Sequence, residues 1–157
     1  MNIKQLVAFI ALCGFSAGTH TLPVPHIAIH KPKPHLVGLP AYIQIAAKKS
    51  GLPPRLIAAV VHVESHGHER IVSSAGAIGL TQLEPATAKF LGVNPWNPKQ
   101  NVVGGAVYLA KLVRRFGSIR KALIAYNEGP TSFAQGQVCP ASLSYAAKVV
   151  RYESTGS

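Results

Sequence analysis

The chain has 157 residues, with 16 lysines and arginines, five glutamates and no aspartate, and its formal net charge is +11. That length allows one domain with one core, and two cysteines exclude a small fold held together by several disulfides. The charge favours an anionic partner. The shortage of carboxylates limits the acid–base chemistry that the chain can perform.

Residues 1–18 have the pattern of a secretory signal. Lys4 supplies a positive start, residues 6–12 are apolar, and residues 16–18 are small enough for cleavage. The apolar stretch is too short to span a bilayer as a helix. Lipidation at Cys13 is disfavoured because a bulky residue precedes it. We therefore expect an exported protein that is periplasmic or associated with the cell wall.

Residues 19–37 are rich in proline and histidine, and we expect an extended linker there, because prolines oppose regular structure. A single domain should then occupy residues 38–153. For an exported basic protein, cell-wall polymer is a better partner than nucleic acid, which would be the default inside a cell. We expect a monomer.

Helix signals recur through this domain, and strand signals are nearly absent. Proline or a capping residue opens each expected helix, and glycine follows most of them. The expected helices cover approximately residues 40–50, 53–66, 85–91, 97–116, 118–125 and 140–152. Residues 69–83 should form a structured loop with at most a small irregular β element. The predicted fold class is mainly α.

Glu64 is the strongest candidate for chemistry. It ends an apolar run in which Ile57 and Val60 share its helix face. A carboxyl group beside such a stripe loses solvation, which favours its neutral form and suits a general acid. The same pattern fits a glutamate on the solvent side of the last helical turn, and this segment alone does not decide between the two interpretations.

Further motifs lie downstream of Glu64. They are Glu-Ser at residues 64–65, Gly-Leu-Thr-Gln within residues 73–88, Ala-Tyr-Asn within residues 125–130, and the residues Asn101, Gly104, Tyr108 and Leu109. In order and spacing they resemble the soluble lytic murein transglycosylase family over residues 40–152. The resemblance implies a lysozyme-like domain. It also implies cleavage of the β-1,4 bond between N-acetylmuramic acid and N-acetylglucosamine, with formation of a 1,6-anhydromuramic end.

The resemblance also implies roles for individual residues. Glu64 would be the single catalytic acid, with neither metal nor cofactor. Sugar contacts would come from Ser73, Gln82, Tyr126, Asn127 and Tyr145, and structural support from Ser65, Gly79 and Leu80. Thr81 and Glu128 depart from the family pattern, in which methionine and alanine are commoner at these positions.

The number of carboxylates bears on the reaction. Glycoside hydrolases commonly use two carboxylates, and here only Glu69 and Glu128 could serve as a second one near the motifs. A one-carboxylate transglycosylase fits better, while a lysozyme-type muramidase and a non-catalytic glycan-binding module remain alternatives. The small size resembles enzymes that open the wall for secretion or conjugation machinery.

A zinc hydrolase is a further alternative, because His62 and His66 share a helix face and His68 follows. In the metalloprotease pattern, however, the glutamate directly follows the first histidine, whereas Glu64 comes two residues after His62. We therefore predict no metal site.

Overall fold

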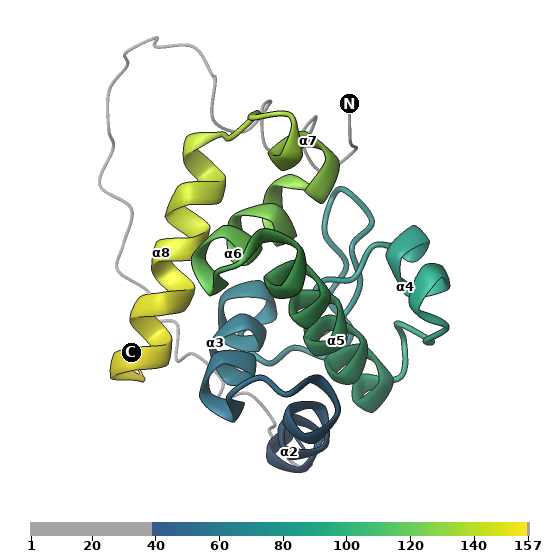
Figure 1. Ribbon diagram of the computed structural model, residues 1–157. Helices are drawn as coiled ribbons and strands as arrows, with labels where there is room; N and C mark the ends of the chain where they lie inside the picture. The colour runs from purple at the N-terminus through teal and green to yellow at the C-terminus, as the bar shows by residue number, and fades with distance from the viewer. Residues whose placement is uncertain (1–38, 157) are drawn as a thin grey trace, which may run out of the picture.

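The computed structural model describes residues 39–156, with side chains from residue 41 onward. The predicted signal and linker lie outside the described residues. Within that range the chain folds into helices α2 (Leu39–Ser50), α3 (Pro54–Ser65), α4 (Pro85–Leu91), α5 (Pro98–Phe116), α6 (Ile119–Glu128), α7 (Pro130–Ala134) and α8 (Pro140–Thr155) (Figure 1). None of these helices is long and apolar enough to cross a membrane.

Local sequence explains where most helices begin. Proline occupies the first positions of α3, α4, α5, α7 and α8, where its missing N–H leaves no hydrogen bond unmade. Asn97 and Ser118 cap α5 and α6 by accepting hydrogen bonds from the N–H groups of Gln100 and Lys121. The sequence did not predict α7, because its five residues are too few to show helical periodicity.

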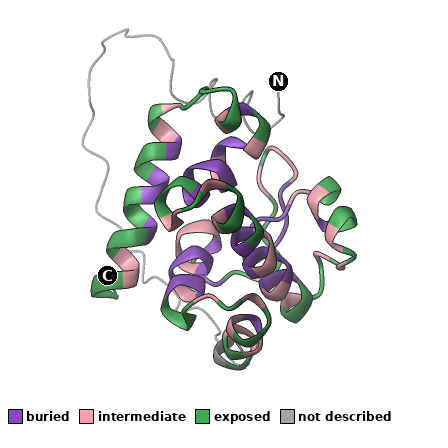
Figure 2. Ribbon diagram, viewed as in Figure 1, coloured by how far each residue is buried: buried purple, intermediate pink, exposed green. Residues whose placement is uncertain are grey.

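Helix α3 lies at the centre of the fold and is buried on two faces. Leu56 and Val60 belong to a core shared with α5, α6 and α8, whereas Ile57 and Val61 belong to a second core shared with α2, α5 and Leu80. Figure 2 shows these buried stretches facing one another between the helices. This double burial explains why the apolar run of α3 is almost continuous, and it holds Glu64 at a fixed place.

The segment between α3 and α4 has no extended strand. Residues 66–84 contain two isolated antiparallel bridges, Val72 with Ile78 and Ile78 with Leu83. The prediction of a mainly α fold, with a small irregular β element in this loop, is confirmed.

Candidate active site

Three helices converge on Glu64, the penultimate residue of α3. The helix ends one residue later, where His66 adopts a left-handed conformation and donates its N–H to the carbonyl of His62. Glu64 is half-buried. Tyr126 of α6 and Tyr145 of α8 are buried, and each lies close enough for the Glu64 charge to raise the pKa of its hydroxyl.

The Tyr145 hydroxyl lies close to Glu64. Burial is the largest cause of its raised pKa, followed by the negative charge of Glu64, and a hydrogen bond with Glu64 contributes as well. By distance and angle, however, the buried hydroxyl makes no regular hydrogen bond to the described residues. Because its pKa lies well above 10, Tyr145 is a neutral donor beside the carboxyl group at neutral pH.

The Tyr126 hydroxyl connects α6 to the loop. It donates to the carbonyl of Thr81 at 2.8 Å, and only 2% of the residue is exposed. Its pKa is raised well above 10, first by burial and then by the charge of Glu64. The tyrosine therefore braces the loop next to the acid, and this contact was not predicted. Its sugar-binding role stays a prediction.

Asn101 of α5 holds the loop in place. The side chain is 0% exposed. Its Oδ1 accepts from the N–H and the hydroxyl of Thr81 at 2.8 and 2.7 Å, and its Nδ2 donates to the carbonyls of Ile78 and Pro95 at 2.8 and 2.9 Å. All four hydrogen-bonding positions of the amide are thus used. From the sequence, Asn101 was recognised as one of the motif residues, but no role was predicted for it.

Two glycines allow the loop to approach α5 this closely. A Cβ atom on Gly79 would lie 2.7 Å from Asn101 Nδ2, and one on Gly105 would lie 2.4 Å from Thr81 Oγ1. Gly79 also has a positive φ of 74°, which favours glycine. The Gly-Leu-Thr-Gln motif therefore packs directly against the helix backbone.

Ser65 fixes the other side of the loop to α3. Its Oγ lies 2.9 Å from the carbonyls of both Val61 and Leu80, and it accepts from the N–H of Gly67 at 3.2 Å. Leu80 is fully buried in the second core. The residue after Glu64 thereby links the end of α3 to the Gly-Leu-Thr-Gln segment.

Two of the predicted sugar-binding residues take part in the internal bonding of the loop. Gln82, which has a positive φ of 48°, donates from Nε2 to the carbonyls of Gly79 and Ile71 at 2.9 and 3.3 Å. Ser73 accepts the N–H of Ala77 on its Oγ at 3.0 Å. These contacts brace the loop, and the sugar contacts of both residues stay predictions.

The Glu128 carboxyl group accepts hydrogen bonds from the start of α8. The residue is 3% exposed, and its Oε2 accepts from the N–H of Cys139 at 3.0 Å and from the Ser142 hydroxyl. Asn127, the preceding residue, is half-buried and lies 3.1 Å from Ser142 Oγ. The helix is thus anchored by a carboxylate from α6, since Cys139 itself provides no side-chain cap.

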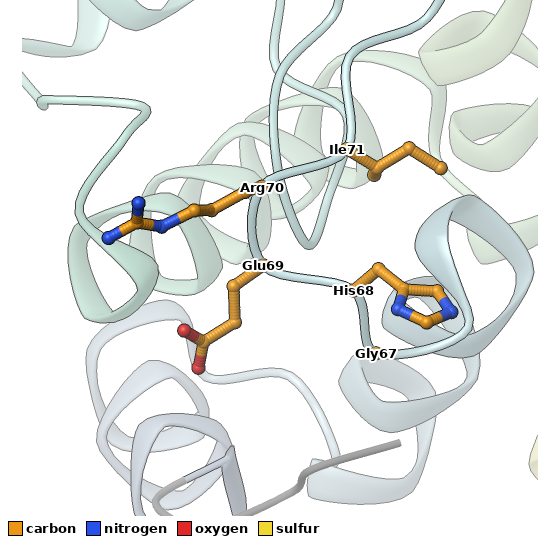
Figure 3. A pocket seen from close by; sticks show the side chains of 5 residues that line it. All are labelled: Gly67, His68, Glu69, Arg70 and Ile71. Atoms are coloured by element: carbon orange, nitrogen blue, oxygen red, sulfur yellow. The ribbon is translucent and has the colours of Figure 1, made fainter. Parts of the chain in front are cut away.

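An open groove of about 610 Å³ follows α3 and is lined by residues 67–71. Figure 3 shows Glu69 and Arg70 extending to one side of this segment and His68 and Ile71 to the other. The groove brings charged, aromatic and aliphatic side chains close to the end of the helix that carries Glu64.

Two of the three histidines proposed as zinc ligands lie side by side at the end of α3. The ring of His62 stacks on that of Tyr152 with 3.9 Å between centroids. The His66 ring centroid lies 4.9 Å from that of His62. In residues 39–156, no three histidine, cysteine or carboxylate side chains converge as metal ligands.

The helical fold around one half-buried glutamate and two buried tyrosines is that of a lysozyme-like transglycosylase domain. The family described as "Transglycosylase SLT domain" matches residues 41–138. The chain belongs to this family, and the resemblance recognised in its motifs is confirmed.

Relatives agree with this assignment. The chain is 44% identical to a "Transglycosylase" of Enterobacteria phage PRD1 over 110 residues, covering 69% of this chain and 40% of the relative. It is 38% identical to "Membrane-bound lytic murein transglycosylase F 1" of Alkalilimnicola ehrlichii over 102 residues, covering 58% and 21%. The chain therefore spans less than half the length of these relatives.

Solved structures show the same fold. The lytic transglycosylase Slt of Pseudomonas aeruginosa, an inactive mutant, superposes with a TM-score of 0.65 at 26% identity, covering 78% of this chain and 24% of that one. The 70 kDa soluble lytic transglycosylase of Escherichia coli superposes with a TM-score of 0.63 at 22% identity, covering 72% and 23%. The lysozyme-like fold predicted from the sequence is confirmed.

Proposed function

We propose that the protein is a peptidoglycan lytic transglycosylase in which Glu64 is the only catalytic acid and base. The observation that carries this proposal is the position of Glu64, half-buried at the end of α3 and facing two buried neutral tyrosines. Family membership supports it. So does the Pseudomonas relative, whose inactive form replaces a glutamate by glutamine.

The reaction needs two proton transfers through one carboxyl group. Protonated Glu64 donates its proton to the glycosidic oxygen, and the bond between that oxygen and C1 of N-acetylmuramic acid breaks. The C6 hydroxyl of the same sugar then attacks C1, and its proton passes to the Glu64 carboxylate. A 1,6-anhydro ring forms, Glu64 is protonated again, and no water is consumed.

The two tyrosines have different positioning roles. The Tyr145 hydroxyl remains neutral, so it can donate to the Glu64 carboxyl group both before and after that group gives up its proton. Tyr126 keeps Thr81, and with it the loop, at a fixed distance from α6. Ser73, Gln82 and Asn127 lie on the segments that would line the sugar-binding cleft, and we retain them as substrate contacts.

The other carboxylates favour a one-carboxylate mechanism. Glu128 accepts hydrogen bonds from the start of α8. Glu84 lies at the start of α4 beside Tyr108, whose pKa is raised first by burial and then by the charge of Glu84. Glu69, which lines the groove, is the remaining candidate for a second carboxylate. A lysozyme-type muramidase would need it to position a water molecule.

The cellular setting follows from the same proposal. Relatives are named membrane-bound lytic murein transglycosylases, and export to the cell envelope agrees with the pattern of residues 1–18. The net charge of +11 in the full sequence would promote adsorption to anionic wall polymer, and high salt should weaken that adsorption. Local wall opening for secretion or conjugation machinery remains a proposed role, and a pull-down from envelope extract that recovers no assembly component would count against it.

Mass spectrometry of soluble products released from peptidoglycan tests the reaction. We expect muropeptides with a 1,6-anhydromuramic end from the wild-type protein and none from Glu64→Gln, whereas the control Glu153→Gln, near the end of α8, should behave as wild type. Products one water heavier would instead identify a muramidase, and Glu69→Gln should then abolish them. If Glu64→Gln still releases anhydro products, the assignment of the acid is wrong. Binding to peptidoglycan without products from either protein would indicate a non-catalytic module.

A further inference from the structure

One serine hydroxyl faces two acceptors at the junction of α6 and α8. Ser142 Oγ contacts Glu128 Oε2, and it also lies 3.1 Å from the amide atom assigned as Asn127 Oδ1. A hydroxyl has one proton to donate and two lone pairs with which to accept. It therefore cannot donate to both acceptors at once.

The backbone decides which acceptor receives the proton. Glu128 Oε2 accepts the N–H of Cys139 at 3.0 Å, and an N–H group can only donate. As an ionised carboxylate Glu128 can only accept, so its contact with Ser142 requires Ser142 to donate. The lone pairs of Ser142 then face Asn127 and the thiol of Cys139, which lies 3.1 Å away.

Two oxygen atoms facing each other without a proton between them repel. An asparagine amide keeps its shape when its oxygen and nitrogen are exchanged, and hydrogen bonds decide its orientation. With Nδ2 turned toward Ser142, every contact in the cluster pairs a donor with an acceptor. Asn127 Nδ2 and the Cys139 thiol donate to Ser142, and Ser142 donates to Glu128.

We propose that Glu128, through Ser142, fixes the Asn127 amide so that its carbonyl oxygen is presented outward as a hydrogen-bond acceptor for an N–H or hydroxyl donor of the glycan. Asn127 is half-buried, and the outer atom of its amide makes no hydrogen bond to residues 39–156, so it is open to solvent. An N-acetyl group offers such an N–H. Glu128 is thus a positioning residue for the substrate contact, and this inference rests on the proposed function.

Amide hydrogen exchange in the ¹⁵N-labelled full chain tests the orientation without substrate. The side-chain signals of Asn127 are assigned by their loss in Asn127→Ala. Two other asparagines set the scale. Asn94 is exposed and uses its oxygen for the N–H of Trp96, so its Nδ2 faces solvent, whereas Asn101 Nδ2 is buried with two acceptors.

We expect Asn127 Nδ2 to exchange about tenfold more slowly than that of Asn94. Ser142→Ala should remove this protection, and the exposed neighbour Ser144→Ala should leave it intact. Exchange of Asn127 at the rate of Asn94 in the wild-type chain would overturn the proposal, because Nδ2 would then face solvent. Since no turnover is measured, that outcome leaves the proposed reaction untouched.

Two variants of Glu128 test the consequence for binding. In Glu128→Ala the Ser142 hydroxyl is free to donate to Asn127, so the Asn127 amide should turn and present Nδ2 outward. The KM for glycan should then rise about tenfold, which corresponds to the loss of one hydrogen bond, and kcat should change less. Glu128→Gln retains an oxygen that can accept from Ser142 and should restore the wild-type KM. Thermal denaturation should first show that both proteins are folded. Equal KM values for Glu128→Ala and the wild type would then contradict the proposed positioning role.

Discussion

The two sides of the candidate site are held by different forces. On the helical side, Tyr126 and Tyr145 lie within the apolar core of α3, α5, α6 and α8. On the loop side, residues 66–84 are held by a polar network centred on Asn101. All four hydrogen bonds of its side-chain amide go to the loop or to the turn before α5.

The difference indicates how each side should respond to change. Removing the Tyr145 hydroxyl breaks no regular hydrogen bond, whereas a buried network that loses its centre leaves several polar groups without a partner in an apolar environment. Loss of this hydroxyl should therefore affect catalysis more than stability, and the loop side should be sensitive in both.

Asn101→Ala should have the largest effect on stability. It leaves the N–H of Thr81 and the carbonyl of Pro95 without a partner and removes one of two donors to the carbonyl of Ile78, which keeps the N–H of Leu83, and we expect a loss of about 3–5 kcal/mol in the free energy of unfolding. Urea denaturation measures it. The control Asn94→Ala removes an exposed side-chain bond and should cost less than about 1 kcal/mol. Similar losses for both variants would mean that the network does not hold the loop.

Tyr145→Phe should separate catalysis from stability. Removing the donor beside Glu64 should lower kcat by about 10², while the free energy of unfolding changes little, because the hydroxyl makes no hydrogen bond of ideal geometry. The control Tyr42→Phe, on the second core, should leave kcat unchanged. Turnover of Tyr145→Phe at the wild-type rate would show that Glu64 works without this contact.

Gly105→Ala should strain the loop side by sterics alone. The added methyl group would meet Oγ1 and Cβ of Thr81 at 2.4 and 2.6 Å, which should cost about 1–3 kcal/mol of stability. Gly104→Ala is the matched control, because its methyl would meet the movable side-chain ends of Val93 and Leu83. The comparison fails if Gly104→Ala is the more destabilising of the two in thermal denaturation.

The smallest expected effect concerns pH and His62, which stacks on Tyr152. Burial, and then the charge of His66, lower the pKa of His62 below 6.5. The unfolded chain therefore binds this proton at a higher pH than the folded chain, so stability is lost as the pH falls below about 6.5. Urea denaturation between pH 7.5 and 5.5 should show a shallower loss for His62→Gln than for the wild type. His68→Gln, at an exposed position, should keep the wild-type slope.

The sequence alone predicted the helices and pointed to Glu64 as the candidate acid. Proline at helix starts and glycine after helix ends are local signals, so the boundaries followed to within a few residues. Glu64 stood out because carboxylates are scarce and because it ends the apolar run of α3. The spacing of its companion motifs gave the family, which the comparisons confirmed.

Only the tertiary structure decided how those motifs are used. The contact of Tyr126 with Thr81 joins residues 45 apart in the chain, and that of Asn101 with Thr81 joins residues 20 apart. No local pattern encodes such pairings, because they depend on how the helices pack and on which polar groups become buried together. For the same reason, the bracing contacts of Gln82, the proximity of Tyr145 to Glu64 and the link from Glu128 to Ser142 emerged only from the folded chain.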